Sequence, residues 1–423
     1  MTVRTTRALL AALALAVSPL ALSIAHGQDR PVNDQGDGNR FQRPAQQKAQ
    51  AAQSLSSAVQ QKLAAAQAAQ QAKKIPEALA AAKEGLAAAK TDYEKLTANQ
   101  ILTSISLAAG DEAGAVAAAE AAADTPDASI PAEYKQSIYY AGAALALNAK
   151  HYEKAVTYAK ALQAMGANDA RSQDVIGRVL FASGDPGAIA FIQKQIDAST
   201  ASGKPPSRDQ LQMLLAAQAK AKDEAGAEKT MIQSVLYYND KQDWKQIIDV
   251  SMSTRGIRDI DALMLGRLLF VSGAEVTKDD ADLIGQTAQK MAIYGDAQAA
   301  QAKGATLQMD AARVAADKAD VPNQIGPGAS QNGLFNIKLA EALYGYGMYA
   351  QAESVARTAQ SKGGADPSEV GMLIGLSQVM QGKYAEGIAT LGAVQGGGPA
   401  TPRVAELWIT YAKIKGGLQT ASR

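Results

Sequence analysis

The sequence lacks cysteine altogether and contains only two histidines in 423 residues. The absence of cysteine excludes disulfides, thiolate zinc sites, cysteine nucleophiles and a lipid-modified cysteine. Of the two histidines, His26 lies near the start of the chain, which leaves His151 as the only imidazole beyond it. A cluster of imidazole ligands is therefore excluded, and we expect neither a metal nor a cofactor.

Aromatic residues are also scarce, at 5% of the chain, although hydrophobic residues reach 47%. The apolar content is therefore mostly alanine and aliphatic residues, and alanine has the highest helix propensity. Because alanine buries little area, the stability of such a chain must come from many small contacts summed along its length. Stacked helical hairpins meet this requirement, so the composition predicts an all-α fold that grows by adding units.

Net charge is almost absent as well. The formal value is +1, and without the first 27 residues, which hold two arginines and no acid, it becomes −1 (+1 − 2). A chain with so little net charge has no general attraction for nucleic acid or for acidic membrane surfaces. Charged residues interrupt every later apolar run, so we expect no membrane insertion after the leader is removed.

The beginning of the chain has the features of a secretory signal peptide. Arg4 and Arg7 form a short positive region, and residues 8–25 are apolar. Small residues at Ala25 and Gly27 fit cleavage after Gly27, and cleavage after Ala25 is the alternative. An uncleaved anchor is a third interpretation, since the apolar stretch just reaches a spanning length. We expect a soluble, exported protein of the bacterial periplasm.

Two segments near the C-terminus, 339–359 and 374–394, carry the clearest internal repeat. Their matching glycines, Gly347 and Gly382, lie 35 residues apart (382 − 347), and a tyrosine follows each glycine two positions later. A glycine can adopt the left-handed conformation that ends a first helix, and small residues let two antiparallel helices approach closely. The repeat therefore predicts pairs of antiparallel helices.

This pattern resembles the tetratricopeptide repeat, whose unit is two helices in about 34 residues. Asp366-Pro367 is similar to the proline-marked turn between such units. Fainter echoes extend the pattern upstream: they are ALNAKHYEKAVTYAKAL around Tyr152, DEAGA at 111–115 and 223–227, IGRVLFASG at 176–184 and LGRLLFVSG at 265–273. The resemblance implies a right-handed superhelical solenoid of antiparallel helix hairpins.

The predicted organisation has five parts. They are a signal peptide at 1–27, a flexible polar linker at 28–50, a degenerate helical-repeat array at 51–319, a Gly/Pro linker at 320–332, and C-terminal tetratricopeptide-like repeats with a capping helix at 333–423. On the capping helix, we expect Trp408 and Tyr411 to seal the core.

The resemblance also implies a binding surface, because ligands of such arrays usually lie against the first helices of successive units. The matching positions are Leu334, Ile337, Glu341, Tyr344, Glu369, Met372, Leu376 and Met380. Methionine adapts its shape to a bound peptide, and a helix fits in such a groove. The alternative interpretation is that these residues form the core between helices.

Other candidate sites have simpler explanations. The glycine-rich stretch 326–333 lacks the Gly-Lys-Ser/Thr ending of a phosphate loop. His151 is expected in a solvated hairpin turn, and Asp279, Asp280 and Asp282 at the start of a helix rather than around a metal ion. We therefore expect a scaffold or adaptor that binds envelope proteins and is not an enzyme.

Two alternatives stay open. One is an envelope enzyme acting on glycans with carboxylates inside the superhelix. The other is a structural protein that self-associates through an Ala/Gln-rich helix at 45–74. The sequence does not indicate the oligomeric state.

Overall fold

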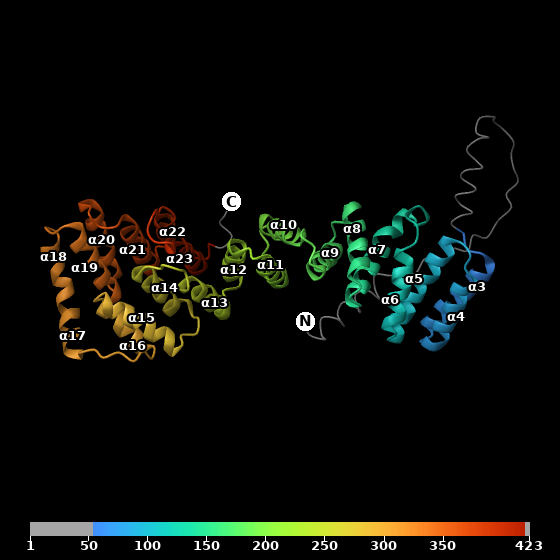
Figure 1. Ribbon diagram of the computed structural model, residues 1–423, viewed down its shortest axis with the longest axis horizontal. Helices are drawn as coiled ribbons and strands as arrows, with labels where there is room; N and C mark the ends of the chain where they lie inside the picture. The colour runs from blue at the N-terminus through green and yellow to red at the C-terminus, as the bar shows by residue number, and fades with distance from the viewer. Residues whose placement is uncertain (1–53, 419–423) are drawn as a thin grey trace, which may run out of the picture. The chain divides into compact units, whose positions relative to one another are not determined.

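The computed structural model describes residues 54–418, so the predicted leader and the predicted polar linker lie outside the described residues. Every regular element within 54–418 is a helix, and no strand occurs there (Figure 1). No helix in that range is both long enough and apolar enough to cross a membrane. The chain forms two compact units that divide between Ile192 and Gln193.

The N-terminal unit is a series of helical hairpins. Consecutive helices pack in pairs, the longest of them being α5 with 18 residues. In chain order the helices are α3 (Ser57–Gln71), α4 (Ile75–Ala88), α5 (Asp92–Ala109), α6 (Glu112–Ala123), a 3-10 turn (Asp127–Ser129), α7 (Ala132–Asn148), α8 (Tyr152–Ala164), α9 (Ala170–Ser183) and α10 (Ala188–Ala201), within which the division between units falls.

The C-terminal unit also begins and ends with hairpins, with an insertion between α16 and α19. Its helices are α11 (Arg208–Ala221), α12 (Glu224–Tyr238), α13 (Lys241–Met252), α14 (Asp259–Ser272), α15 (Lys278–Lys290), α16 (Tyr294–Ala302), α17 (Ala311–Asp320), a 3-10 helix (Val321–Gln324), α18 (Ile325–Gly328), α19 (Gly333–Gly345), α20 (Tyr349–Lys362), α21 (Pro367–Met380), α22 (Tyr384–Gly392) and α23 (Thr401–Lys415).

A residue in the left-handed conformation ends the first helix of most hairpins. In the N-terminal unit these residues are Lys73, Gly110, Lys150 and Gly184, at intervals of 37, 40 and 34 residues. In the C-terminal unit they include Lys222, Ala292, Gly347 and Gly382. This conformation turns the chain back so that the next amides reach the last carbonyls of the helix. The predicted hairpin turns at Gly347 and Gly382 are confirmed.

The tyrosines of the predicted repeat, Tyr152, Tyr349 and Tyr384, each open the second helix of a hairpin. Tyr294, which the sequence pattern did not indicate, does the same at the start of α16. The small residues also act as expected. A methyl group placed on Gly387 of α22 would lie 2.6 Å from a Val379 side-chain carbon of α21, so only glycine allows this approach.

Polar residues at the predicted helix starts act as caps. Asp111 and Asp223, the first residues of the two DEAGA copies, each accept a hydrogen bond from the amide of the glycine three positions later, at 2.9 Å. Thr277 and Asp280 form a reciprocal capping box at the start of α15. The acidic group there is thus part of a helix N-terminus, where carboxylates are favoured.

Glu94 holds the start of the N-terminal unit together. Its carboxylate accepts backbone hydrogen bonds from Ser56 at 2.9 Å, Lys90 at 2.7 Å and Thr91 at 3.1 Å. Burial raises the pKa of this carboxyl group, but the hydrogen bonds, with Ser56 foremost, outweigh it and lower the pKa to about 2. The ionised form is therefore the one that the folded state stabilises.

Replacing Glu94 by alanine is expected to lower the free energy of unfolding of the N-terminal unit by about 1–3 kcal/mol, because the amides of Ser56, Lys90 and Thr91 lose a charged acceptor. The folded pKa lies below the ordinary value, so the carboxylate's contribution is complete above pH 4.5 and is lost as the pH falls through about 2. Urea unfolding of the wild type and of Glu94→Ala at several pH values should show that the difference between their free energies of unfolding shrinks as the pH falls. A difference that does not change with pH would contradict this assignment.

The C-terminal unit is closed by its last helix. α23 packs against α22, which precedes it, and also against α21, α14 and the distant α12 (Figure 1). Trp408 and Tyr411 are buried, as predicted, and their rings meet edge to face at 5.7 Å. Trp408 contacts α14, and the Tyr411 ring meets Trp244 of α13 with 6.4 Å between ring centres, so α23 joins the end of this unit to helices near its start.

The segment 320–332, predicted as a linker, lies inside the C-terminal unit. It forms the 3-10 helix and α18, which pack against each other and against α19. The amide of Asn336 anchors it through hydrogen bonds to the carbonyls of Gly328 at 2.9 Å and Gln331 at 3.3 Å. The sequence-based division at 320–332 therefore does not coincide with the division between the compact units at 192.

Candidate protein-binding surfaces

The eight positions expected to form a groove differ sharply in exposure. Five of them are buried: Ile337, Glu341, Tyr344, Met372 and Leu376. Glu369 and Met380 are half-buried, and Leu334 is 55% exposed. A buried side chain offers no surface to a partner. These five residues therefore form part of the core between helices, which was the alternative to a groove.

These buried positions lie mainly against the neighbouring helices of their own repeats, and α14 reaches α19 through the side chain of Arg267. Nine of its fourteen residues are buried, so it has almost no free face. Its apolar side chains belong to one buried cluster with Ile337, Tyr344, Met372 and Leu376. The side chains expected to meet a ligand are thus part of the core that the C-terminal repeats share with α14.

Arg267 of α14 makes the central polar contacts in this core. Its Nη2 atom donates to Asp296 of α16 and to Glu341 of α19, both at 2.7 Å. Its guanidinium carbon lies 4.2 Å from the centre of the Tyr344 ring. Burial raises the pKa of Glu341 even though Arg267 opposes this shift. Two positions of the predicted groove, Glu341 and Tyr344, therefore bind α14.

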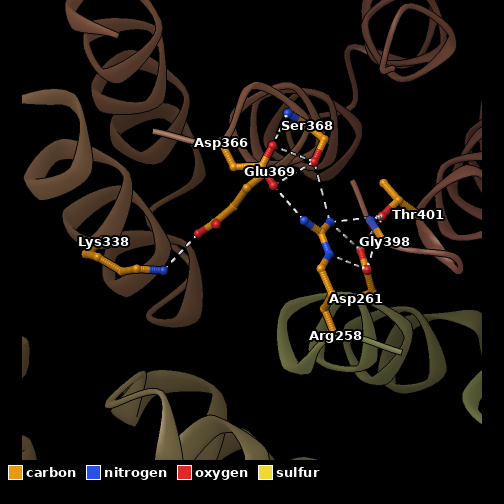
Figure 2. Close-up of polar contacts among 8 residues, drawn as sticks. All are labelled: Arg258, Asp261, Lys338, Asp366, Ser368, Glu369, Gly398 and Thr401. Atoms are coloured by element: carbon orange, nitrogen blue, oxygen red, sulfur yellow. Dashed lines mark hydrogen bonds and ion pairs between the residues drawn. The ribbon is translucent and has the colours of Figure 1, made fainter. Parts of the chain in front are cut away.

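A second polar cluster fixes the start of α14 (Figure 2). The Arg258 side chain points between two acidic groups, with Nε 2.7 Å from Asp261 of α14 and Nη1 2.6 Å from Asp366 of α21. Thr401 of α23 donates to Asp261 at 3.0 Å and accepts from Arg258 at 2.9 Å. Three helix starts, those of α14, α21 and α23, thereby meet at Arg258.

Glu369 takes part in a separate contact beside this cluster. Its carboxylate points away from Arg258 and meets Lys338 of α19 at 2.9 Å, as Figure 2 shows. This ion pair joins the first helices of the two C-terminal repeats. Of the predicted groove positions, Leu334 and Met380 are left as the exposed or half-exposed apolar ones.

The C-terminal helix adds the last contacts to α14. The indole N–H of Trp408 donates to the carbonyl of Met264 at 3.0 Å. Trp408 is fully buried, and Arg403 of the same helix forms an ion pair with Glu228 of α12. The C-terminal unit thus surrounds α14 with its own helices on several sides.

The N-terminal unit, in contrast, has an open cleft of about 330 Å³. Its lining comes from α6, the end of α7 and the turn after it: Glu112, Ala113, Val116, Ala117, Glu120, Leu145, Asn148, Ala149 and His151. The cleft exists because α6 carries alanine and one valine where larger side chains would fill the space. Its floor is therefore apolar and its rim polar.

A network of charged side chains supports one side of the rim. His151 Nδ1 lies 2.6 Å from Glu120 Oε1, and Lys154 donates to Glu120 at 3.0 Å and to Asp124 at 2.9 Å. The Tyr158 hydroxyl donates to Asp124 at 2.5 Å, and burial together with this bond raises the pKa of Tyr158. These contacts join α6 to α8, so His151 is a rim residue with a partner and not merely solvated.

A smaller hollow lies in the C-terminal unit among α11, α12 and α13. It measures about 130 Å³ and is lined by residues that include Arg208, Thr230 and Asp243. A cavity of about 150 Å³ accommodates one benzene ring. The cleft of the N-terminal unit has more than twice the volume of this hollow, so it is the larger site for a partner's side chain.

Within residues 54–418 the structure shows no group of three or more acidic, histidine or cysteine residues placed to hold a metal ion. Asp296 and Glu341, the acidic pair on Arg267, lie in the core with exposures of 6% and 0%. A glycan has no access to carboxylates buried in this way.

Sequence reasoning missed the cleft between α6 and α7. The signal was the run EAGAVAAAEAAA at Glu112–Ala123, whose only apolar side chain larger than alanine is one valine. A helix of this composition packs its neighbours closely on one face and leaves a hollow wherever no neighbour covers it.

No family model matches the chain, and no curated protein matches it. The repeat architecture therefore stands on the hairpins, their turn residues and their spacing.

Proposed function

We propose that the protein is an exported tetratricopeptide-like adaptor that binds other proteins of the cell envelope through the cleft between α6 and α7. The fold supports this reading, since hairpin arrays commonly bind peptide segments on the surfaces between their helices. The proposed location is the bacterial periplasm, on the strength of the leader at 1–27.

The observation that carries the proposal is the contrast between the two units. In the C-terminal unit five of the eight expected groove positions are buried, and one of them, Glu341, bonds to Arg267 of α14. In the N-terminal unit the α6–α7 cleft is open and about 330 Å³ in volume. An apolar hollow with a polar rim is the usual form of a binding site.

Filling the cleft tests this function. Ala117 lines the cleft, and Ala121 lies one turn later on the same helix, exposed but outside the lining. Ala117→Tyr is expected to reduce the capture of partners from periplasmic extract at least about tenfold, since a tyrosine occupies the space that the partner needs. Ala121→Tyr should capture as much as the wild type.

The readout is mass spectrometry of co-purified proteins, with circular dichroism to verify that each variant folds. Equal capture by all three proteins would refute a role for the cleft. Substitutions at Met372 or Leu376, which are fully buried, would disturb folding and do not test binding.

A further inference from the structure

The chain around the cleft has an unusual distribution of charge. Between Lys95 and Lys135 there is no lysine or arginine, while six acidic residues occur: Asp111, Glu112, Glu120, Asp124, Asp127 and Glu133. The segment includes all of α6, which forms one wall of the cleft. The whole chain is nearly neutral, so this stretch is locally acidic, and Lys135 and Lys154 pair with three of its six carboxylates.

The two acidic residues of the rim, Glu112 and Glu120, differ in whether they have an ion-pair partner. Glu120 already has His151 and Lys154 as partners. Glu112, exposed in the first turn of α6, has no ion-pair partner among residues 54–418. A carboxylate at the edge of an apolar hollow attracts a cation that the bound molecule carries beside its apolar group. The free negative charge of the rim is therefore at Glu112.

The floor of the cleft determines which side chain of a bound molecule fits. It is formed by Ala113, Val116, Ala117, Leu145 and Ala149, none of which offers a side-chain hydrogen bond. A volume of about 330 Å³ is about twice that of a cavity that accommodates benzene. One aromatic or large aliphatic side chain therefore fits, with space for part of its backbone.

We propose that the cleft binds a protein segment in which an aromatic or large aliphatic residue stands beside arginine or lysine. The apolar side chain occupies the floor, and the cation pairs with Glu112. This inference rests on the proposed function, because it names the chemistry of the partner at the same cleft. An acidic segment should bind more weakly, because Glu112 repels it.

Three labelled seven-residue peptides test the proposal with the full-length mature chain in fluorescence anisotropy. Their central residues are Arg-Phe-Arg, Glu-Phe-Glu and Arg-Ser-Arg, each between Gly-Ser pairs. The first is expected to bind at least about tenfold more tightly than either of the others, because only it meets both requirements. Its binding should weaken as salt is added, since the ion pair at the rim is exposed.

Reversing the charge of Glu112 tests directly whether this residue pairs with the cation of the peptide. Glu112→Lys is expected to weaken the Arg-Phe-Arg peptide roughly three- to tenfold and to strengthen Glu-Phe-Glu. The matched control is Glu153→Lys, which also lies exposed in the first turn of a helix but outside the cleft. It should leave both peptides unchanged, and Ala117→Tyr should abolish binding of the first.

Equal binding of the three peptides, or equal effects of Glu112→Lys and Glu153→Lys, would overturn the inference. Failure of the proposed function looks different. In that case Ala117→Tyr would not change capture from extract. If Ala117→Tyr blocks capture while the peptides show no preference, the cleft binds proteins of another chemistry, and only the present inference fails.

Discussion

Replacing Arg267 with methionine is expected to lower the free energy of unfolding of the C-terminal unit by about 3–5 kcal/mol. The substitution leaves Asp296 and Glu341 in the core without their cation, and both are almost inaccessible to solvent. An uncompensated buried charge costs more than the pair contributes, which is why the loss is large. Urea unfolding followed by circular dichroism measures it.

Two variants separate this effect from a loss of packing. Arg267→Met combined with Asp296→Asn and Glu341→Gln removes all three charges, and we expect it to recover part of the lost stability. Arg357→Met removes a half-exposed arginine that pairs with Glu353, and it should cost about 1 kcal/mol or less. If Arg267→Met were no more destabilising than Arg357→Met, the buried ionic contact would not hold α14 in place.

Trp408→Ala is expected to cost about 3–5 kcal/mol in the same unit. The indole is fully buried, and it donates to the Met264 carbonyl of α14 at 3.0 Å. Removing it leaves a cavity between α23 and α14, and both helices should then show faster amide hydrogen exchange. The exchange rates and the unfolding free energy are measured on the full chain.

Trp408→Phe is the matched control for this prediction. It keeps an aromatic ring in the site but removes the hydrogen bond to Met264, so a loss of about 1–3 kcal/mol is expected. Faster exchange in α23 alone, with α14 unchanged, would show that α23 does not hold α14.

The hairpins were predictable because their signals are local. A left-handed turn residue, a following tyrosine and small residues at the crossing are each readable from positions such as Gly347, Tyr349 and Gly387. Alanine and capping residues then fix the helices between the turns. The degenerate turns are harder to find, since Lys222 and Ala292 adopt the same conformation without being glycine.

The role of α14 was not predictable, because it depends on contacts far apart in the sequence. The near copies IGRVLFASG and LGRLLFVSG place Arg178 and Arg267 at the same position. Arg178 forms an ion pair with Asp174 one turn away on the same helix, whereas Arg267 meets Glu341 on a helix 74 positions later. Only the tertiary structure distinguishes the two.

The candidate site was missed for a related reason. The C-terminal repeats have the strongest repeat signal, so the groove was assigned there. A strong repeat fixes local geometry, but it does not reveal that Trp408 and Arg258 bring α14 against those helices. The cleft at Ala117 comes from what the sequence lacks, large side chains on α6, and a motif search does not detect an absence.

We propose that partners bind in the cleft of the N-terminal unit and not on the C-terminal repeats. Site-specific photo-crosslinking compares the two directly, with a benzoylphenylalanine placed at Ala117 or at Leu334, which is 55% exposed on α19. We predict crosslinks to envelope proteins from position 117 and none from position 334. Crosslinks from position 334 without any from position 117 would contradict the account.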